Sequence, residues 1–190
     1  MRACYADPPY IGQAKNHYSN DPRCDEVDHQ KLVLELEKFD CWALSCSSPT
    51  LNQILNVCPK DVRIGSWVKP FCAFKPNVNP AYAWEPVVFR VSRTKEHKRT
   101  REQRTIRDWH SENITLQTGC AGAKPEGFCY WVFEFLNLTP TDTLFDMYPG
   151  SGNVTTYWKK FVSLRTINPK IDVGAYVDGL VEEQLCMLPA

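Results

Sequence analysis

Apolar runs and amphipathic segments alternate along most of the chain. Five short runs rich in hydrophobic residues have the length of strands, whereas segments between them repeat their apolar residues every three to four positions, as a helix does. This alternation predicts an α/β fold with a mostly parallel sheet. The strands are expected at residues 2–6, 41–46, 62–68, 87–91 and 143–148.

Helix-start signals mark where the intervening helices begin. Asp25 and Asn153 are expected to act as N-caps, and Pro49 fits the first turn of a helix. Residues 162–167 have the composition of a further strand. The helices are expected over about residues 25–38, 48–58, 128–136 and 153–161.

Composition fits a single globular domain over residues 1–190. Hydrophobic residues make up 43% and charged residues 23%, which is typical of chains that fold, and a net charge of zero does not exclude a nucleic-acid partner. The nine cysteines form no CxxC pair, so we expect buried free thiols and no metal site. The chain begins without an apolar signal core and has no run long enough to span a bilayer, which favours a cytoplasmic protein.

The stretch from Ser92 to Asp108 is basic, with seven Lys or Arg residues against three acidic ones. Two interpretations are open: a solvated loop, or a loop whose cations contact the phosphates of a nucleic acid. The candidates for phosphate contacts are Arg99, Arg101, Arg104 and Arg107.

The first strand leads directly into Asp7-Pro8-Pro9-Tyr10. An exocyclic amine of a base is a poor nucleophile because its lone pair is delocalised into the ring, and an enzyme can help by accepting hydrogen bonds from both N–H groups. A carboxylate supplies one acceptor and a backbone carbonyl in a rigid Pro-Pro turn the other. The tyrosine can stack on a base that has left the helix. The alternative interpretation is a proline-rich turn after a strand.

The last expected strand ends in a second motif, DMYPGSG, from Asp146 to Gly152. Glycines between a strand and a helix let a ligand approach the backbone at the helix N-terminus. The spacing lacks the third glycine of a dinucleotide motif and the Lys of a Walker loop. The acidic residue before the turn suits a ligand with a cation and an amino acid head. The alternative is an ordinary strand–turn–helix corner.

Together the two motifs resemble those of the amino-methyltransferases of DNA, in the permuted β order in which the catalytic motif precedes the cofactor motif, and of small phage-type members in particular. The resemblance implies a Rossmann-like, S-adenosylmethionine-dependent methyltransferase sheet, circularly permuted and shortened after the cofactor-loop helix, that methylates adenine N6 in DNA. It covers about residues 1–160, through the segments ADPPYIG, WVKPF, YAWEPVVF, KPEGFCYWVFEFL and DTLFDMYPGSGNVT.

The resemblance also implies roles by position. Asp7 accepts a hydrogen bond from the target amine, Pro8 and Pro9 shape the turn, and Tyr10 stacks on the base. For Lys124 the alternative is a surface lysine at a helix start, and for Glu85 a buried salt-bridge partner. The residues implied for S-adenosylmethionine are Ala6, Asp7, Lys124, Pro125, Asp146, Tyr148, Pro149, Gly150, Ser151 and Gly152.

Two features depart from the family pattern. The expected strand at 162–167 ends in Asn168 and Pro169, where family members place an acidic residue that binds the ribose hydroxyls; Asp172 lies beyond the proline. No separate target-recognition domain fits either, so a basic loop at about residues 92–122 takes its place in this interpretation.

Several functions remain open from the sequence. The first is an adenine-specific DNA methyltransferase. The alternatives are an RNA adenine or cytosine N4 methyltransferase, and a non-catalytic nucleic-acid-binding protein on the same fold. The presence of both DPPY and GSG favours an enzyme. The sequence leaves open whether the chain forms a homodimer.

Overall fold

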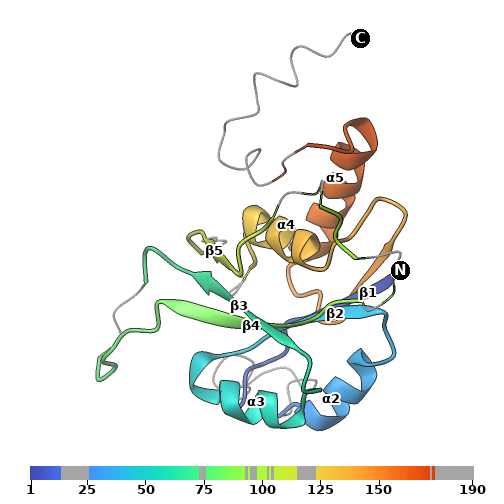
Figure 1. Cartoon of the computed structure of the whole chain (residues 1–190). Helices are drawn as coiled ribbons and strands as arrows, with labels where there is room; N and C mark the ends of the chain where they lie inside the picture. The colour runs from blue at the N-terminus through green and yellow to red at the C-terminus, as the bar shows by residue number, and fades with distance from the viewer. Residues whose placement is uncertain are drawn as a thin grey trace.

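The computed structural model describes residues 1–13, 26–72, 76–92, 94, 98–101, 103, 105–114, 123–171 and 173. The centre of the protein is a six-stranded sheet with the order β5-β3-β4-β2-β1-β6 (Figure 1). Only β4 runs antiparallel to its neighbours in this sheet, which confirms the predicted mostly parallel α/β architecture. The strands are β1 Arg2–Ala6, β2 Cys41–Ser45, β3 Arg63–Val68, β4 Trp84–Arg90, β5 Trp109–Ser111 and β6 Thr143–Asp146.

Helices cover both faces of the sheet and give the molecule three layers (Figure 1). On one face lie α2 (His29–Leu36) and α3 (Leu51–Val57), which follows the 3-10 turn η1 (Ser48–Thr50). On the other face lie α4 (Glu126–Phe135) and α5 (Asn153–Ile167). Because both faces are covered, most residues of the central strands β1 and β2 are apolar and buried, as is typical of parallel strands.

The alternation of side chains along each strand divides the core in two. In β1, Ala3 and Tyr5 pack into the cluster that includes α4 and α5. Cys4 and Ala6 point to the other face and pack into the cluster that includes α2 and α3. A shift of one residue in the register of β1 would therefore exchange these two sets.

Two helix starts differ from the sequence-based expectation. The N-cap of α2 is Asp28, whose side chain accepts a hydrogen bond from the backbone N–H of Lys31 at 3.1 Å; Asp25 lies outside the described residues. The residue that caps α5 is Gly152, at a φ of 77°. Asn153 is the first residue of the helix, and its side chain donates to the carbonyl of Lys124 at 3.3 Å.

The predicted strand at residues 162–167 is wrong, because α5 continues as a helix to Ile167. Phe161 and Leu164 lie three residues apart, on one face of the helix, and both are buried in the aromatic core with α4. Packing of this face keeps the segment helical, so no ribose-binding strand end forms at Asn168. Asp172 lies outside the described residues.

The edge strand β5 was not predicted from the sequence, and β4 begins earlier in the chain than expected. Strand β5 has only three residues, Trp109–Ser111, which is too short for an alternation to be visible. Strand β4 starts at Trp84 and contains Pro86, a residue that argued against a strand at that position.

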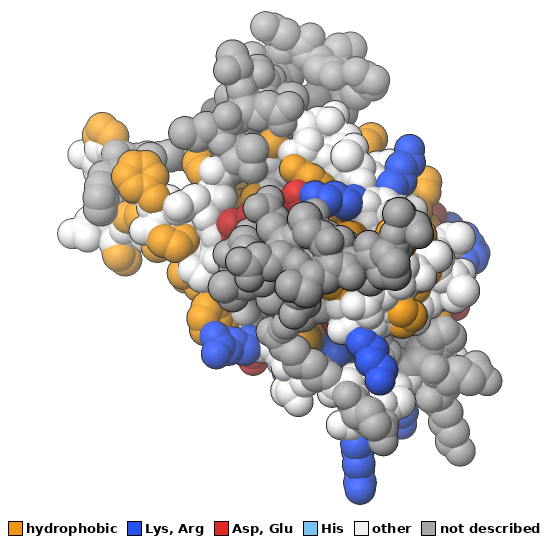
Figure 2. Space-filling view, turned by 90° about the horizontal axis from the view of Figure 1, so that it is seen from above, with side chains coloured by type: hydrophobic (Ala, Val, Ile, Leu, Met, Phe, Trp, Pro, Cys, Tyr) orange, Lys and Arg blue, Asp and Glu red, His pale blue; other side chains and the backbone are white. Residues whose placement is uncertain are grey.

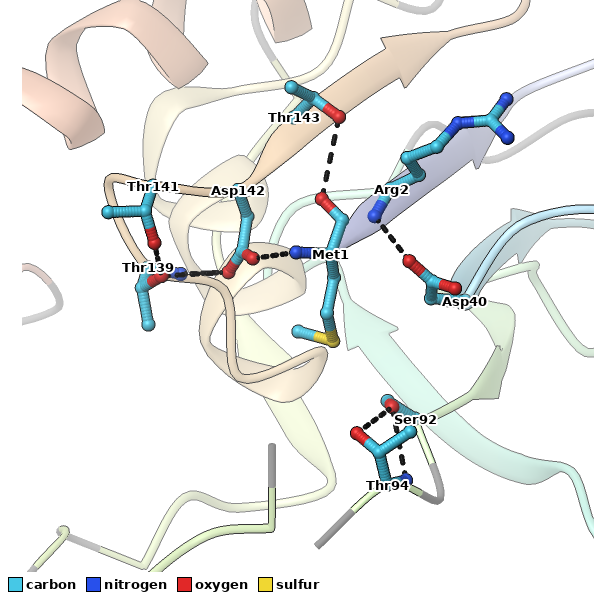
Figure 3. Close-up of polar contacts among 9 residues, drawn as sticks. All are labelled: Met1, Arg2, Asp40, Ser92, Thr94, Thr139, Thr141, Asp142 and Thr143. Carbon is cyan, nitrogen blue, oxygen red and sulfur yellow. Dashed lines mark hydrogen bonds and ion pairs between the residues drawn. The ribbon is translucent and has the colours of Figure 1, made fainter. Parts of the chain in front are cut away.

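Polar contacts tie together the starts of the parallel strands, at the end of the sheet that we call the amino edge (Figure 3). The α-amino group of Met1 forms an ion pair with Asp142, the residue before β6. The backbone N–H of Arg2 donates to Asp40, just before β2, at 2.6 Å. Ser92, which follows β4, lies at the same edge. The opposite end of the sheet, where the parallel strands finish, is called the carboxyl edge.

Six cysteines lie in the described residues, all as free thiols, and four of them are buried. Among the residues described, no helix is long and apolar enough to cross a membrane. In the same part of the chain, no group of three or more His, Cys, Asp or Glu side chains is arranged to hold a metal ion.

Candidate active site at the carboxyl edge

The two sequence motifs meet at the carboxyl edge of the sheet. Strands β1 and β6 are parallel neighbours, with Tyr5 opposite Asp146 in the register. The pairing continues past the strand end, because the N–H of Met147 donates to the carbonyl of Tyr5 at 2.9 Å. The turn of Asp7 and the loop that begins at Tyr148 therefore start side by side, which is where open α/β sheets place their ligands.

Asp7 is held by a buried lysine from the segment before α4. The Nζ of Lys124 lies 2.7 Å from the Oδ2 of Asp7, and the side chain of Lys124 is only 6% exposed. The alternative interpretation of Lys124 as a surface lysine is therefore wrong. Pro125, its neighbour, is the N-cap of α4, so the start of this helix sets the position of the lysine.

The charges of this pair depend on each other. Burial raises the pKa of the Asp7 carboxyl, and the ammonium of Lys124 opposes that rise. Burial alone would lower the pKa of Lys124, but the carboxylates of Asp7 and Glu85 raise it. Lys124 consequently stays protonated, and its charge favours the ionised form of a carboxyl that is costly to bury.

The hydroxyl of Tyr10 reaches a second carboxylate. It donates to the Oε2 of Glu85 at 3.0 Å and lies 3.5 Å from the Oδ1 of Asp7. Glu85 in turn forms an ion pair with Lys69, and its side chain is 21% exposed, so the expected salt bridge is confirmed but its burial is only partial. Lys69 was missed by the sequence reasoning. Its only signal was its place directly after the expected strand at 62–68, which puts it at the carboxyl edge.

At the end of β6, Asp146 has an unsatisfied carboxylate oxygen. Its Oδ1 is buried and has no hydrogen-bond partner among the described residues, while its Oδ2 is 3.4 Å from the hydroxyl of Thr155. Burial raises the pKa of Asp146. A buried acceptor without a partner is unusual in a folded protein, so this oxygen is a candidate for contact with a ligand.

The loop after Asp146 leaves space beside the backbone. Gly150 and Gly152 have φ angles of 45° and 77°, in the left-handed region that favours glycine. A Cβ added at Gly150 would meet only the carbonyl of Tyr148, at 3.9 Å, and one at Gly152 would meet nothing within 4 Å. Gly152 is also the N-cap of α5, and the first N–H groups of a helix have no partner within the helix.

The remaining residues implied for this site gather at the same edge. Ala6 is the last residue of β1 and is fully buried, and Pro8 is buried behind the turn. Pro9 and Tyr148 are half-buried, whereas Pro149 and Ser151 are exposed. The structure thus brings together both halves of the site that were expected from the sequence.

The basic stretch lies elsewhere. Strand β4 ends and β5 begins at the amino edge, so the chain between them starts and finishes far from Asp7. Arg99 donates to the carbonyl of Glu134, near the C-terminal end of α4. Arg107 lies with its guanidinium 5.0 Å from the centre of the Trp109 ring, Arg101 is exposed, and Arg104 lies outside the described residues. This placement does not support phosphate contacts around the site, and a role in binding stays a prediction.

Known proteins support the fold. No protein-family model matches the chain, and no curated protein sequence matches it. The chain is similar to the crystal structure of the M1.HpyAVI-SAM complex, with a TM-score of 0.55 and 14% identity over 85% of this chain and 78% of that one. It is also similar to the crystal structure of M1.HpyAVI, with a TM-score of 0.54 and 17% identity over 84% of this chain and 76% of that one. The protein has the same α/β fold as these two structures.

Proposed function

We propose that the protein binds S-adenosylmethionine and methylates the exocyclic amine of a base in DNA, with adenine N6 as the target. The observation that carries this proposal is the meeting of Asp7 and Asp146 at the ends of two neighbouring parallel strands. One carboxylate lies in a DPPY turn and the other before an open glycine loop. The fold shared with a structure that holds S-adenosylmethionine supports the choice of cofactor.

The residues at the end of β6 fit this cofactor. The Oδ1 of Asp146 lacks a donor among the described residues, and Gly150 and Gly152 leave room for a ligand against the backbone. The N-terminus of α5 would face the carboxylate of an amino acid head. When bound, the cofactor supplies a methyl group on a positively charged sulfur.

The DPPY turn fits the amine that receives the methyl group. Asp7 would accept a hydrogen bond from one N–H of the amine and offset the positive charge that develops on nitrogen. The backbone carbonyl of Pro8 would accept the second hydrogen bond. Tyr10 would stack on the base once it has left the helix. Lys124 would keep the carboxylate of Asp7 ionised and oriented.

Nucleic acid would be held beside the site by the connection between β3 and β4, residues 69–83, which we call the β3–β4 arm. The described parts of the arm, residues 69–72 and 76–83, lie beyond the strands at the carboxyl edge (Figure 1). Its side chains include Phe71 and Tyr82, which are 72% and 53% exposed, and hydrophobic side chains gather on this side of the molecule (Figure 2). The sequence of the arm has two lysines and no acidic residue. Lys69 is engaged by Glu85 and Lys75 lies outside the described residues, so the exposed aromatics carry the argument, because unstacked bases stack on aromatic side chains.

The experiment that tests the function is incubation with labelled S-adenosylmethionine and a panel of DNA and RNA, followed by nucleoside mass spectrometry. The proposal predicts N6-methyladenine from DNA. N4-methylcytosine, or a methylated nucleoside from RNA alone, would replace the proposed substrate with one of the alternatives. Absence of any methylated nucleoside with saturating cofactor would overturn the proposal.

A further inference from the structure

The hydroxyl of Tyr10 lies between two carboxylates and can donate to only one of them. A phenol carries a single O–H hydrogen. The shorter distance is to the Oε2 of Glu85, 3.0 Å, and the longer is to the Oδ1 of Asp7, 3.5 Å. Glu85 comes from β4 and Asp7 follows β1, so two separate strands present competing acceptors to one donor.

Each of the two carboxylates has its own lysine. Lys69 pairs with Glu85, and Lys124 pairs with Asp7 through the other oxygen, Oδ2. Both ammonium groups lie over the buried ring of Trp67, at 4.7 and 5.6 Å from its centre. The Oδ1 of Asp7 is therefore the oxygen that is not engaged by a lysine, and the Tyr10 hydroxyl is its nearest competitor for a hydrogen bond from substrate.

We propose that Glu85 is a positioning residue that accepts the hydrogen bond of Tyr10 and thereby leaves the Oδ1 of Asp7 open to the target amine. This inference rests on the proposed function and deepens it. Lys69 supports the role, because its ion pair fixes Glu85 at the end of β4. The same contact holds the Tyr10 ring in place for stacking on the base.

The physical reason is competition for one oxygen. If Glu85 could not accept, rotation of the Tyr10 O–H bond would direct its hydrogen to Asp7, as a charge-assisted hydrogen bond. Burial and the two nearby carboxylates raise the pKa of Tyr10 well above its usual value, so the phenol stays a donor throughout the neutral range. The target amine would then have to displace this bond before its own N–H could be accepted.

The proposal predicts an unusual pattern in a double-mutant cycle. Glu85→Leu should lower kcat by about tenfold or more, because a charge-assisted hydrogen bond then blocks Asp7. Glu85→Gln should retain most of the rate, since its amide oxygen still accepts from Tyr10. Tyr10→Phe should lower the rate of the wild type modestly but raise the rate of the Glu85→Leu variant. A role of Glu85 in stability alone would not make the second substitution beneficial.

A readout that needs no activity accompanies the kinetics. The pKa of Asp7, followed through the ¹³C signal of its carboxyl group, should fall in Glu85→Leu because Tyr10 now donates to it. The pKa of Asp7 should rise again in Glu85→Leu/Tyr10→Phe. Lys69 has lost Glu85 in both variants, so the difference between their Asp7 pKa values reports the hydrogen bond from Tyr10 and not the charge of Lys69. Thermal unfolding of each variant identifies any that do not fold.

Two results would overturn the proposal. One is that Glu85→Leu/Tyr10→Phe has a kcat no higher than that of Glu85→Leu and shows no rise in the Asp7 pKa relative to it. The other is a Glu85→Gln variant as slow as Glu85→Leu, which would show that charge and not the acceptor is required. Absence of transferase activity in the wild type would overturn the proposed function. The Asp7 pKa values of the variants would then show, without kinetics, whether Tyr10 donates to Asp7 when Glu85 is removed.

Discussion

The two edges of the sheet differ in what their polar groups do. At the amino edge, oppositely charged groups pair with one another: Met1 with Asp142, and Arg99 and Arg165 with Glu134, although the Nε of Arg165 is buried without a hydrogen-bond partner among the described residues. At the carboxyl edge, an oxygen of Asp146 is buried without a donor among the described residues.

The basic stretch of the sequence and the two sequence motifs lie at opposite edges of the sheet. The most basic stretch of the chain connects two strand ends at the amino edge. The carboxyl edge has few basic residues, but it has the open glycine loop and the exposed aromatic side chains of the β3–β4 arm. On the proposed function, substitutions at the two edges should have different consequences.

The largest effect is expected for cofactor binding. Gly150→Val places a branched side chain in the space beside the glycine loop, where the protein itself offers almost no contact. We expect no calorimetric signal with S-adenosylmethionine. Gly12→Val is the control, because Gly12 also has a left-handed φ, 76°, and open surroundings, so the substitution strains a left-handed backbone position outside the glycine loop. Binding by Gly150→Val as tight as that of the wild type would remove the glycine loop from the cofactor site.

The next effect concerns turnover. Asp7→Asn retains size but removes the charge that offsets the developing charge on nitrogen, so we expect a loss in kcat on the order of 10²-fold or more. Cofactor affinity should change little. Asp142→Asn makes the same chemical change in an ion-paired carboxylate at the amino edge, and it should lower the thermal stability without a comparable loss of kcat. Equal losses of kcat in the two variants would contradict the distinction between the edges.

A smaller effect is expected for the β3–β4 arm. Phe71→Ala and Tyr82→Ala should each weaken DNA binding, by roughly 1–3 kcal/mol for each base that is stacked. Leu34→Ala is the control, since Leu34 is 61% exposed on α2, away from the arm. Fluorescence anisotropy with single-stranded and duplex DNA measures the change. If the three variants bind equally well, the arm is not the surface that holds the bases.

The smallest effect is expected at the amino edge. Arg101→Ala and Arg107→Ala together should leave the dependence of DNA affinity on salt nearly unchanged, because neither arginine lies near the site. Arg99 is left intact since it contacts Glu134. A decrease in the salt slope of about one unit per arginine would show phosphate contacts. That result would restore the basic loop as part of the binding surface.

The sequence predicted the parts of the site that depend on local order. The strand at residues 2–6 and the strand before DMYPGSG were recognisable from apolar runs followed by turn motifs, and parallel pairing then places their ends together. The contact between Tyr10 and Glu85 could not be predicted in this way. It joins residues 75 positions apart and depends on β4 being antiparallel, which nothing in its composition signals.

The failure at residues 162–167 has a similar cause. Val162, Leu164 and Ile167 are compatible with a strand by local pattern, and the helix is favoured by burial of Phe161 and Leu164 against α4. Tertiary packing outweighed local propensity there. With the strand, the strand end at which family members place a ribose-binding acidic residue is also absent from residues 162–168.

The most direct test of the account is the nucleoside analysis of DNA incubated with S-adenosylmethionine and either the wild type or Asp7→Asn, at matched concentrations of folded protein. The account predicts N6-methyladenine from the wild type, and a rate of formation lower on the order of 10²-fold or more in the variant. Formation of the same nucleoside at the same rate by both proteins would contradict it, because the carboxylate in the DPPY turn would then not be the acceptor for the target amine.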